Sequence, residues 1–494
     1  MRDKRIVKYI PVAIVLLVFF ILYGMHATAS PRWYDEAVEY WVSKYWTGSV
    51  PGSRTTSNMY EHIAYTYQPP LYNVLMHFWL VISDTEWWYR LAGILTTLFG
   101  AVGIYKAGRE AADEKYGLIG MVLYLSVWPV CYYALEAAEY NLMLACIAWM
   151  LYFFVKNIHT TNWYNIVGYF IWAVLACYSQ YGAAFVVVAL YVTLLIHMRS
   201  DKRALIRLGI CTVITMVVAV IPLVIFFLIP QVRHMRSPEV SHSFYFVHGN
   251  AIKDMVMSAY KVFTTDFGAA LPGMCIGLLL ILSIVCLVRK SNTLNAMLLV
   301  TLIIWVLYYV AVATSFYAFN GCDMDKLGTV NIGGRYCLFF IPVIIVTVTA
   351  GLGVFSQWFK WEKIVLAGAI VSCVGCTMFM CRSLSTMGPK DDVRQVADIW
   401  YDNQAYNSVT YVYWESDANF WFYLVHDDEY TDDMRDGIIN SDDDIDTTLE
   451  EFYYVSYSGQ AAEDMIAAME AEGYRAEYCY EGRSALTHYV KERR

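Results

Sequence analysis

Residues 30–45 read SPRWYDEAVEYWVSKY and follow the first apolar segment of the chain. At about 100° per residue, apolar and aromatic side chains fall on one side of a helix and acidic or polar ones on the other. We therefore predict an amphipathic helix over residues 31–46, lying on the membrane surface where aromatic rings are stable. The apolar side comprises Tyr34, Ala37, Val38, Trp41, Val42 and Tyr45, and the polar side comprises Asp35, Glu36, Glu39 and Ser43.

The acidic side of this helix is unusual for a membrane surface. Helices that only bind membranes carry Lys and Arg there, because lipid headgroups are anionic. Holding Asp35, Glu36 and Glu39 beside such a surface costs electrostatic energy, which indicates that these carboxylates have a functional role. Asp35 and Glu36 are therefore candidate functional residues. The alternative is a helix in a solvated loop, whose charges only face water.

The composition is that of a protein that crosses a membrane many times. Of 494 residues, 58% are hydrophobic and 16% are charged, and the mean hydropathy is +0.42. Because a bilayer requires about 20 apolar residues per helix, the apolar runs predict about eleven spans. They cover residues 9–25, 90–107, 117–135, 141–155, 164–181, 182–198, 209–230, 274–288, 296–316, 336–356 and 363–381. The absence of a basic patch interleaved with aromatic residues outside these runs argues against nucleic-acid binding.

Charge in the connecting segments predicts the orientation of the spans. The segment Leu71–Ile82 is too short to cross hydrocarbon, so we expect a second interfacial helix over residues 70–83. With the N-terminus inside, every inner loop then carries Lys or Arg, as the positive-inside rule requires. These residues are Lys106, Arg109, Lys115, Lys156, Arg199, Lys202, Arg203, Arg207, Arg289, Lys290, Lys360 and Lys363. A cleaved signal peptide, ending at the sequence Ala-Thr-Ala of residues 27–29, is the alternative for the first segment.

The chain is expected to divide into two domains. Residues 1–382 form the membrane domain, and residues 383–494 alternate helix-like and strand-like stretches and are rich in Asp and Glu. Roughly a hundred residues is a normal size for an independently folded unit. We therefore predict a polytopic α-helical membrane protein with a small extracytoplasmic α/β domain at its C-terminus.

A second group of acidic residues lies at the outer end of a predicted span. Glu136, Glu139 and Tyr140 are spaced i, i+3 and i+4, which would place them on one helical face. Ionisable groups at or within the membrane are expensive and are functional candidates for that reason. One carboxylate could accept a proton from a hydroxyl while another holds a cation; Asp35 and Glu136 are the candidate metal ligands. The alternative for Glu136 and Glu139 is a solvated turn.

A late arginine is the candidate partner of a phosphate. Arg335 begins a predicted span after Gly333 and Gly334, and Tyr336 follows it. The guanidinium fork suits a phosphate, and the glycines would let the backbone approach a ligand closely. The alternative is an arginine that extends to lipid headgroups beside an ordinary interfacial tyrosine.

Three features together resemble a known family. They are the acidic pair after the first span, the element Tyr67-Gln68-Pro69-Pro70-Leu71-Tyr72, and the Arg-Leu pair that opens the next span. The chain resembles the bacterial membrane glycosyltransferases of the C-type fold, in particular the dolichyl-phosphate-mannose protein mannosyltransferase-like and aminoarabinose-transferase-like group. The resemblance covers residues 1–200 well and residues 333–342 less strongly.

The resemblance implies roles for individual residues. It places Asp35 or Glu36 at the reaction centre, and it implies that Gln68, Glu136, Glu139, Tyr140, Arg335 and Tyr336 bind substrate. The chain departs from the family pattern at Ala138, where an arginine is usual, and at Gln68, where a histidine is common. Gln180 likewise stands where a histidine is frequent. These departures bear on the identity of the substrate more than on the type of reaction.

The implied activity is transfer of a hexose or pentose from a polyprenyl-phosphate donor to an extracytoplasmic glycan, lipid or protein, with inversion at the anomeric carbon. The expected partners are this donor, the acceptor and membrane lipids, and a divalent cation is a candidate cofactor. A lipid or solute transporter or flippase is the alternative, which would favour broken helices and charges near the middle of the membrane. A scaffold without catalytic activity would give the acidic helix and the Gln-Pro-Pro element no reason to coexist.

Overall fold

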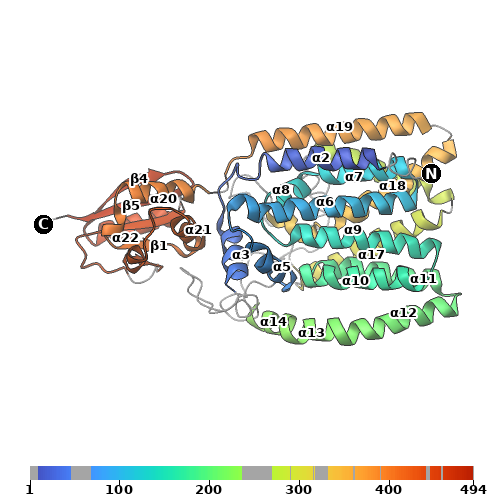
Figure 1. Cartoon of the computed structure of the whole chain (residues 1–494), viewed down its shortest axis with the longest axis horizontal. Coiled ribbons are helices and arrows are strands. Elements are labelled where there is room, and N and C mark those ends of the chain that lie inside the picture. Colours follow the sequence, from blue (N-terminus) through green and yellow to red (C-terminus); the bar gives the residue numbers. More distant parts are fainter. Residues whose placement is uncertain are drawn as a thin grey trace. The chain divides into compact units, whose positions relative to one another are not determined.

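The computed structural model describes residues 9–45, 68–235, 270–289, 291–314, 316–317, 332–359, 362–389, 391–440, 445–457 and 460–492. Contacts divide the chain into two compact units (Figure 1). The first unit comprises Met1–Ala27, Ile63–Leu75 and Trp87–Met387, and the second comprises Thr28–His62, Met76–Glu86 and Gly388–Arg494. The predicted division into domains 1–382 and 383–494 stays a prediction; the second unit takes in Thr28–His62 and Met76–Glu86 besides the C-terminal residues.

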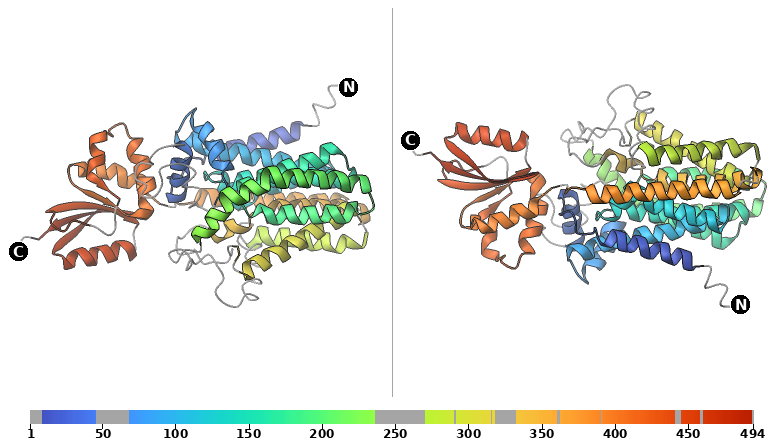
Figure 2. Two further views of the ribbon diagram at one scale, coloured as in Figure 1. Left: turned by 90° about the horizontal axis from the view of Figure 1, so that it is seen from below. Right: turned by 90° about the horizontal axis from the view of Figure 1, so that it is seen from above.

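The first unit is a bundle of helices whose axes lie roughly parallel to one another (Figures 1 and 2). Its described helices are α2 (Ile10–Gly24), α6 (Glu86–Ala111), α7 (Glu114–Ser126), α8 (Trp128–Ala134), α9 (Tyr140–His159), α10 (Trp163–Ser179), α11 (Ala183–Met198), α12 (Lys202–Thr215), α13 (Ile221–Leu223), α14 (Ile229–Met235), α16 (Ala270–Val285), α17 (Asn292–Ala313), α18 (Phe340–Phe359) and α19 (Glu362–Thr386). Short π-helical segments, Met216–Val220 and Val224–Leu228, join α12, α13 and α14 into one long helix. A 3₁₀ helix, η6 (Ile332–Cys337), precedes α18.

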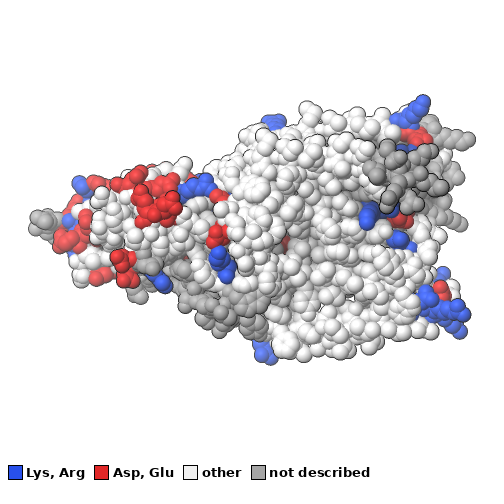
Figure 3. Space-filling model, viewed as in Figure 1, with Lys and Arg blue, Asp and Glu red and all other residues white. Residues whose placement is uncertain are grey.

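Helices α9 and α18 form the centre of this bundle. In their most apolar windows, 78% of α9 and 83% of α18 is buried, against 11% of the long helix Lys202–Arg233 and 28% of α19. The outer helices expose many large apolar side chains, including Val217, Val218 and Val371. On the face that Figure 3 shows, the surface of the helical unit between its two ends is almost free of charge. An apolar outer surface of this kind fits a hydrocarbon environment, so the protein is a multi-pass membrane protein.

The number of spans differs from the prediction. Each predicted apolar run coincides with helical structure, but six of the described helices are long and apolar enough to cross a membrane. The pair α7 and α8, bent by 63°, would make a seventh. Helices α2, α10 and α11 have 15, 17 and 16 residues, which is short of the ~20 that a bilayer requires. The prediction of about eleven spans is therefore not confirmed.

The bend between α7 and α8 has a local cause. Pro129 stands in the first turn of α8 and has no N–H to donate to the carbonyl of Leu125, four residues earlier. The hydroxyl of Tyr23, on α2, donates to this Leu125 carbonyl instead. Both Tyr23 and Leu125 are fully buried, so this hydrogen bond satisfies a polar group that the proline leaves open inside the bundle.

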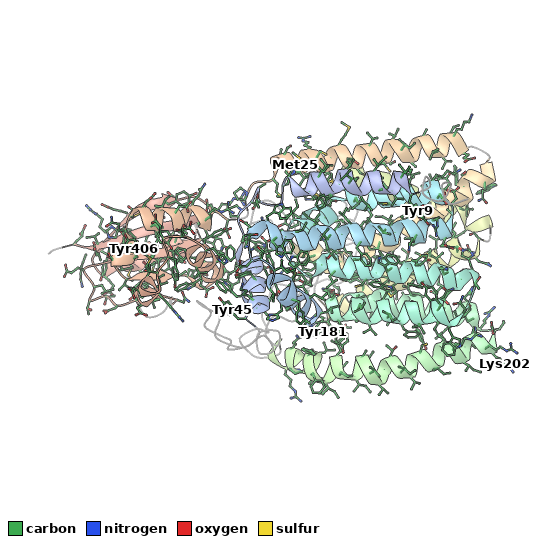
Figure 4. All side chains as sticks on the ribbon, in the orientation of Figure 1. Tyr9, Met25, Tyr45, Tyr181, Lys202 and Tyr406 are labelled. Atoms are coloured by element: carbon green, nitrogen blue, oxygen red, sulfur yellow. The ribbon has the colours of Figure 1, made fainter. Side chains whose placement is uncertain are left out.

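The predicted inner loops are neighbours at one end of the bundle. The ring nitrogen Nε2 of His159, at the end of α9, lies 3.0 Å from the carbonyl of Glu110 at the end of α6. The Nη1 of Arg207 donates to the carbonyl of Thr161 at 3.3 Å. Lys202 lies at this same end, opposite the end that carries Tyr181 (Figure 4). The basic loops thus share one end, as the positive-inside argument requires, while the side of the membrane they face remains a prediction.

The second unit contains a mixed five-stranded sheet in the order β2-β1-β3-β5-β4. Its strands are β1 (Thr410–Val412), β2 (Ile438–Ile439), β3 (Glu451–Tyr457), β4 (Tyr474–Glu481) and β5 (Ser484–Lys491). Strand β1 pairs in parallel with β2 and β3, and β5 pairs antiparallel with β3 and β4. Helices α20 (Val393–Asp402), α21 (Trp414–Val425) and α22 (Gln460–Ala471) accompany the sheet. The prediction of a small α/β fold at the C-terminus is confirmed.

Two predicted short helices are present. Helix α3 spans Tyr34–Lys44 within the predicted range 31–46 and belongs to the second unit. Helix α5 spans Leu71–Leu80, and its ten residues are too few to cross a membrane, as expected. The segments between the predicted spans 209–230 and 274–288, and between 296–316 and 336–356, lie largely outside the described residues.

Candidate functional site

The turn between α8 and α9 carries two of the predicted acidic residues. Helix α8 ends at Ala134 and α9 begins at Tyr140, so Glu136 is not on a helix. The N–H of Ala138 donates to the carbonyl of Glu136 at 3.0 Å and closes the turn. The prediction that Glu136, Glu139 and Tyr140 share one helical face is therefore wrong, because this turn interrupts the helical spacing.

Both carboxylates of this turn are enclosed by protein. Glu136 is 5% exposed and Glu139 is 2% exposed, so the alternative of a solvated turn is excluded. Glu139 occupies the N-cap position of α9, where the helix dipole favours a negative charge. Burying a carboxylate is expensive unless it is compensated, so two of them within four residues indicate a purpose beyond packing.

The turn rests directly on α6. A Cβ atom on Gly93 would lie 2.9 Å from the carbonyl oxygen of Ala134 and 3.6 Å from that of Glu136. Glycine at position 93 thus allows the backbone that carries the two carboxylates to approach α6 closely. Sequence patterns alone do not identify this contact, because it joins segments forty residues apart.

Arg335 lies with this acidic turn. Its Nη2 donates to the Tyr336 hydroxyl at 3.2 Å, and its Cζ lies 5.3 Å from the centre of the Tyr336 ring. Arg335 and Glu139 both act electrostatically on the hydroxyls of Tyr133 and Tyr140, and Glu136 acts on Tyr133. The rings of Tyr133 and Tyr140 are 4.6 Å apart. The structure therefore brings together five predicted residues: Glu136, Glu139, Tyr140, Arg335 and Tyr336.

Tyr317 joins this group and was not predicted. Its hydroxyl accepts a hydrogen bond from Nε2 of Gln180 at 3.2 Å, and its ring meets that of Tyr336 edge to face at 6.4 Å. Burial raises the pKa of Tyr317 above its ordinary value, and Glu139 adds to this effect. The sequence signal that could have found Tyr317 is its place just after an apolar helix that ends at Ala313.

We call these residues the arginine–tyrosine cluster. Its members are Tyr133, Glu136, Glu139, Tyr140, Gln180, Tyr317, Arg335 and Tyr336.

Gln68 belongs to a second hydrogen-bonded group in the same unit. Its carbonyl accepts from Nε2 of Gln231 at 2.8 Å, and Oε1 of Gln231 accepts from the Tyr181 hydroxyl at 2.7 Å. The side-chain oxygen of Gln68 is enclosed and has no hydrogen-bond partner within the described ranges. A substrate hydroxyl or amide could donate to this oxygen, which fits the predicted binding role.

The acidic helix α3 differs from its prediction. Glu36 is 3% exposed and Glu39 is 5% exposed, so the polar side is not solvated. Trp41, predicted to face lipid, is 1% exposed, and its Nε1 donates to the carbonyl of Ala418 in α21 at 2.8 Å. The periodicity correctly separates apolar from acidic residues but does not reveal what covers each side. Asp35 is the more accessible of the two predicted catalytic carboxylates.

Asp35 has acidic neighbours in the C-terminal fold. The pKa of Tyr34 is raised by burial and then by the carboxylates of Asp417, Asp35 and Glu415. In the part of the chain that the structure describes, no group of three or more His, Cys, Asp or Glu side chains is arranged to hold a metal ion. The predicted cation site at Asp35 or Glu136 therefore stays a prediction.

The comparisons with known proteins agree with the resemblance. The family model for dolichyl-phosphate-mannose-protein mannosyltransferase matches residues 67–226. None of the curated proteins matches the chain. The structure of ArnT from Cupriavidus metallidurans in the apo state superposes with a TM-score of 0.63 at 14% identity, covering 97% of each chain. The same protein bound to undecaprenyl phosphate gives 0.62 at 14% identity, again over 97% of each chain.

An archaeal oligosaccharyltransferase from Archaeoglobus fulgidus gives a TM-score of 0.45 at 12% identity, over 85% of this chain and 64% of that one. The match to ArnT extends over nearly the whole chain, so the C-type glycosyltransferase fold is confirmed. The resemblance inferred from the sequence is confirmed with it.

Proposed function

We propose that this protein transfers a sugar from a polyprenyl-phosphate donor to an extracytoplasmic glycan, lipid or protein by an inverting displacement. The observation that carries the proposal is the arginine–tyrosine cluster, in which Arg335 lies with two buried carboxylates. The fold adds support, because ArnT shares it and has been seen bound to undecaprenyl phosphate. The multi-pass helical unit suits a substrate whose tail remains in the bilayer.

Arg335 is proposed to bind the donor phosphate. Cleavage of the sugar–phosphate bond turns a phosphodiester with one negative charge into a phosphomonoester that approaches two. A fixed guanidinium therefore stabilises the developing charge more than the ground state, which is how binding accelerates a reaction. The hydrogen bond from Arg335 to the Tyr336 hydroxyl restricts the rotation of the guanidinium, so the cation is oriented before the donor arrives.

Asp35 is proposed as the general base, with Glu36 beside it in sequence. The acceptor hydroxyl gives its proton to the Asp35 carboxylate, and its oxygen forms a bond to the anomeric carbon. The bond from that carbon to the phosphate oxygen breaks, and the polyprenyl phosphate leaves with the electron pair. A single displacement inverts the anomeric centre, and the phosphate is a good leaving group that needs no strong acid.

The remaining predicted residues are proposed to bind substrate. Glu136, Glu139 and Tyr140 supply hydrogen-bond acceptors and a hydroxyl beside Arg335, and Gln68 offers its enclosed side-chain oxygen. A donor phosphate would add negative charge to a group that already holds two carboxylates and one guanidinium. A divalent cation bound at Glu136 would offset this repulsion, and the need for one is tested by chelation.

The test is transfer by purified protein in lipid nanodiscs, with a labelled polyprenyl-phosphate sugar and a panel of acceptors. Wild type is expected to release polyprenyl phosphate and to form a glycoside of inverted configuration, seen by NMR. Movement of the intact donor between leaflets of proteoliposomes, without cleavage, would instead establish the transporter alternative.

The arginine is tested by donor titration. Arg335→Lys is expected to raise the donor KM, because the charge remains but the planar fork is lost. Arg335→Ala is expected to impair donor use further, since charged hydrogen bonds contribute about 1.5–3 kcal/mol.

Arg207→Ala is the matched control. Arg207 also lies over an aromatic ring, with its Cζ 6.0 Å from the centre of the Trp163 ring, but at the opposite end of the bundle. If Arg335→Ala behaves like this control, Arg335 is only a headgroup anchor.

A further inference from the structure

Helix α3 is joined to the C-terminal fold by an aromatic contact within the second unit. The ring of Tyr40 meets the ring of Phe422, in α21, edge to face at 4.9 Å, and its hydroxyl lies 3.2 Å from Nε2 of His426. Trp41 adds the hydrogen bond to the carbonyl of Ala418. Tyr40, Trp41 and Phe422 are all nearly inaccessible to solvent, so this contact is a packed interface.

Arg32 fixes the beginning of the same helix. Its guanidinium Cζ lies 3.9 Å from the centre of the Phe422 ring and 4.9 Å from that of Tyr40, and the whole residue is buried. Its backbone N–H donates to the hydroxyl of Tyr423 at 2.6 Å. A cation stacked on two desolvated rings is held more strongly than one at an exposed site.

The end of α3 is held by charge. The Nζ of Lys44 donates to Oδ2 of Asp84 at 2.6 Å, and Nε2 of His426 lies 3.8 Å from the same oxygen. The hydrogen bond from Lys44 lowers the pKa of Asp84 against the opposing effect of burial. Helix α3 is therefore restrained at its start, middle and end by residues that lie outside it.

These restraints matter because α3 would be only marginally stable as an isolated helix. It has 11 residues, and its N-cap residue, Trp33, makes no capping hydrogen bond through its side chain. Isolated helices shorter than about 12–15 residues are marginal in water. The direction in which α3 presents Asp35 therefore depends on its tertiary contacts.

We infer that the C-terminal α/β domain positions the acidic helix for the transfer step, with Phe422 as the central positioning residue. This inference rests on the proposed function, in which Asp35 is the general base. Phe422 contacts both Arg32 and Tyr40, so one ring fixes the start and the middle of α3. The domain then contributes to catalysis, since without its contacts the start and the middle of α3 lose their restraints and only the pair Lys44–Asp84 still holds its end.

The test compares two Phe→Leu variants of the same domain. Phe422→Leu removes the ring that touches α3. Phe452→Leu is the matched control: Phe452 is also fully buried, but it packs on Tyr411, Tyr474 and Tyr489 within the sheet. Each full-length variant is purified, and amide hydrogen exchange of Tyr34–Lys44 is measured together with kcat and the donor KM.

Phe422→Leu is expected to raise the exchange rate of the α3 amides at least about tenfold. It should lower kcat by about 10- to 100-fold, because misplacing a catalytic group by ~1 Å costs about that much. The donor KM should stay within about twofold. Phe452→Leu should lower the melting temperature of the domain without changing α3 exchange or kcat. A purely structural role for Phe422 would instead make the two variants alike.

A second variant keeps the proposal testable if Phe422→Leu does not fold. Trp41→Phe retains a ring and removes the hydrogen bond to Ala418, and it should raise α3 exchange and lower kcat in the same proportion. Unchanged α3 exchange in a folded variant, or faster exchange with unchanged kcat, would overturn the inference. Asp35→Asn in the same series separates the two proposals. Full turnover in Asp35→Asn refutes the proposed base and with it the positioning role of Phe422. Lost turnover in Asp35→Asn together with full turnover in Phe422→Leu refutes only the positioning role.

Discussion

Replacing Gly93 with alanine tests whether the turn that carries Glu136 and Glu139 must sit where it does. The new Cβ would lie 2.9 Å from the carbonyl oxygen of Ala134, and both atoms belong to regions with little freedom: one to helix α6, the other to the backbone at the end of α8. No flexible side chain can move aside, so the backbone of the turn must shift. A displacement of about 0.5 Å restores ordinary van der Waals contact.

The expected magnitudes follow from this displacement. Overpacking of this kind costs roughly 1–3 kcal/mol. Alanine is favoured over glycine inside a helix by about 1 kcal/mol, so the net loss of stability is roughly 0–2 kcal/mol. If ~1 Å of misplacement costs about 100-fold in rate, then half of it costs about tenfold. Gly93→Ala is therefore expected to remain folded and to lose about a factor of ten in turnover.

The assay is sugar transfer and thermal unfolding of the purified variant beside Gly375→Ala. Gly375 lies on α19, and a Cβ there would meet no atom within 4 Å. This control should be neutral or slightly more stable, with unchanged turnover. Equal effects of the two substitutions, or full turnover in Gly93→Ala, would refute the view that the position of the turn matters for function.

Further predictions concern the base, the buried acid and the topology. Asp35→Asn is expected to reduce turnover by ~10²–10⁴-fold in steady-state transfer assays with little loss of stability, and wild-type turnover would exclude it as the base. Glu36→Gln should reduce turnover, and it should also shift the melting temperature because Glu36 is buried. A variant with unchanged turnover and unchanged melting temperature would contradict both a role in transfer and a contribution to stability. Burial raises the pKa of Asp391 to about 7. Between the ordinary pKa of an aspartate and about pH 7, this carboxyl is therefore protonated in the folded state and ionised in the unfolded state. The stability that Asp391 contributes therefore falls as pH rises, by roughly 3 kcal/mol between about pH 5 and about pH 8. Asp391→Asn should remove this dependence when the free energy of unfolding is measured at these two pH values. A cysteine at Ser441, in a Cys479→Ser background, should react with an impermeant reagent on intact cells; reaction only after lysis would reverse the proposed topology.

Periodicity and composition predicted much of the fold because each segment has a single dominant pattern. The sequence predicted alternating helix-like and strand-like stretches over residues 383–494, and the structure has helices α20 to α22 and strands β1 to β5 there. The number of spans could not be predicted as well. Runs such as residues 164–181 are apolar enough to form a helix, but the helix that forms, α10, has 17 residues and falls short of a full span.

The site was harder to predict because it depends on contacts between distant segments. The sequence identified Glu136, Glu139 and Arg335, since charged residues are rare in apolar surroundings. It did not predict the burial of the two glutamates, which follows from the turn after Ala134 and its contact with Gly93.

The packing of α3 could not be predicted for the same reason. An amphipathic pattern shows that one side of a helix must be covered, but a membrane surface and another protein segment satisfy it equally. Trp41 packs against Ala418, nearly four hundred residues away along the chain. This contact, and not a membrane surface, covers Trp41 on the apolar side of α3.

The most direct test of the central claim is the structure of the protein bound to undecaprenyl phosphate in a nanodisc. The proposed function places the phosphorus within about 4–5 Å of the Arg335 guanidinium carbon, the distance expected for a hydrogen-bonded arginine–phosphate pair. Density for the phosphate at the arginine–tyrosine cluster would support the account. Density for it at the opposite end of the bundle, beside Lys106 and Lys156, would contradict the account.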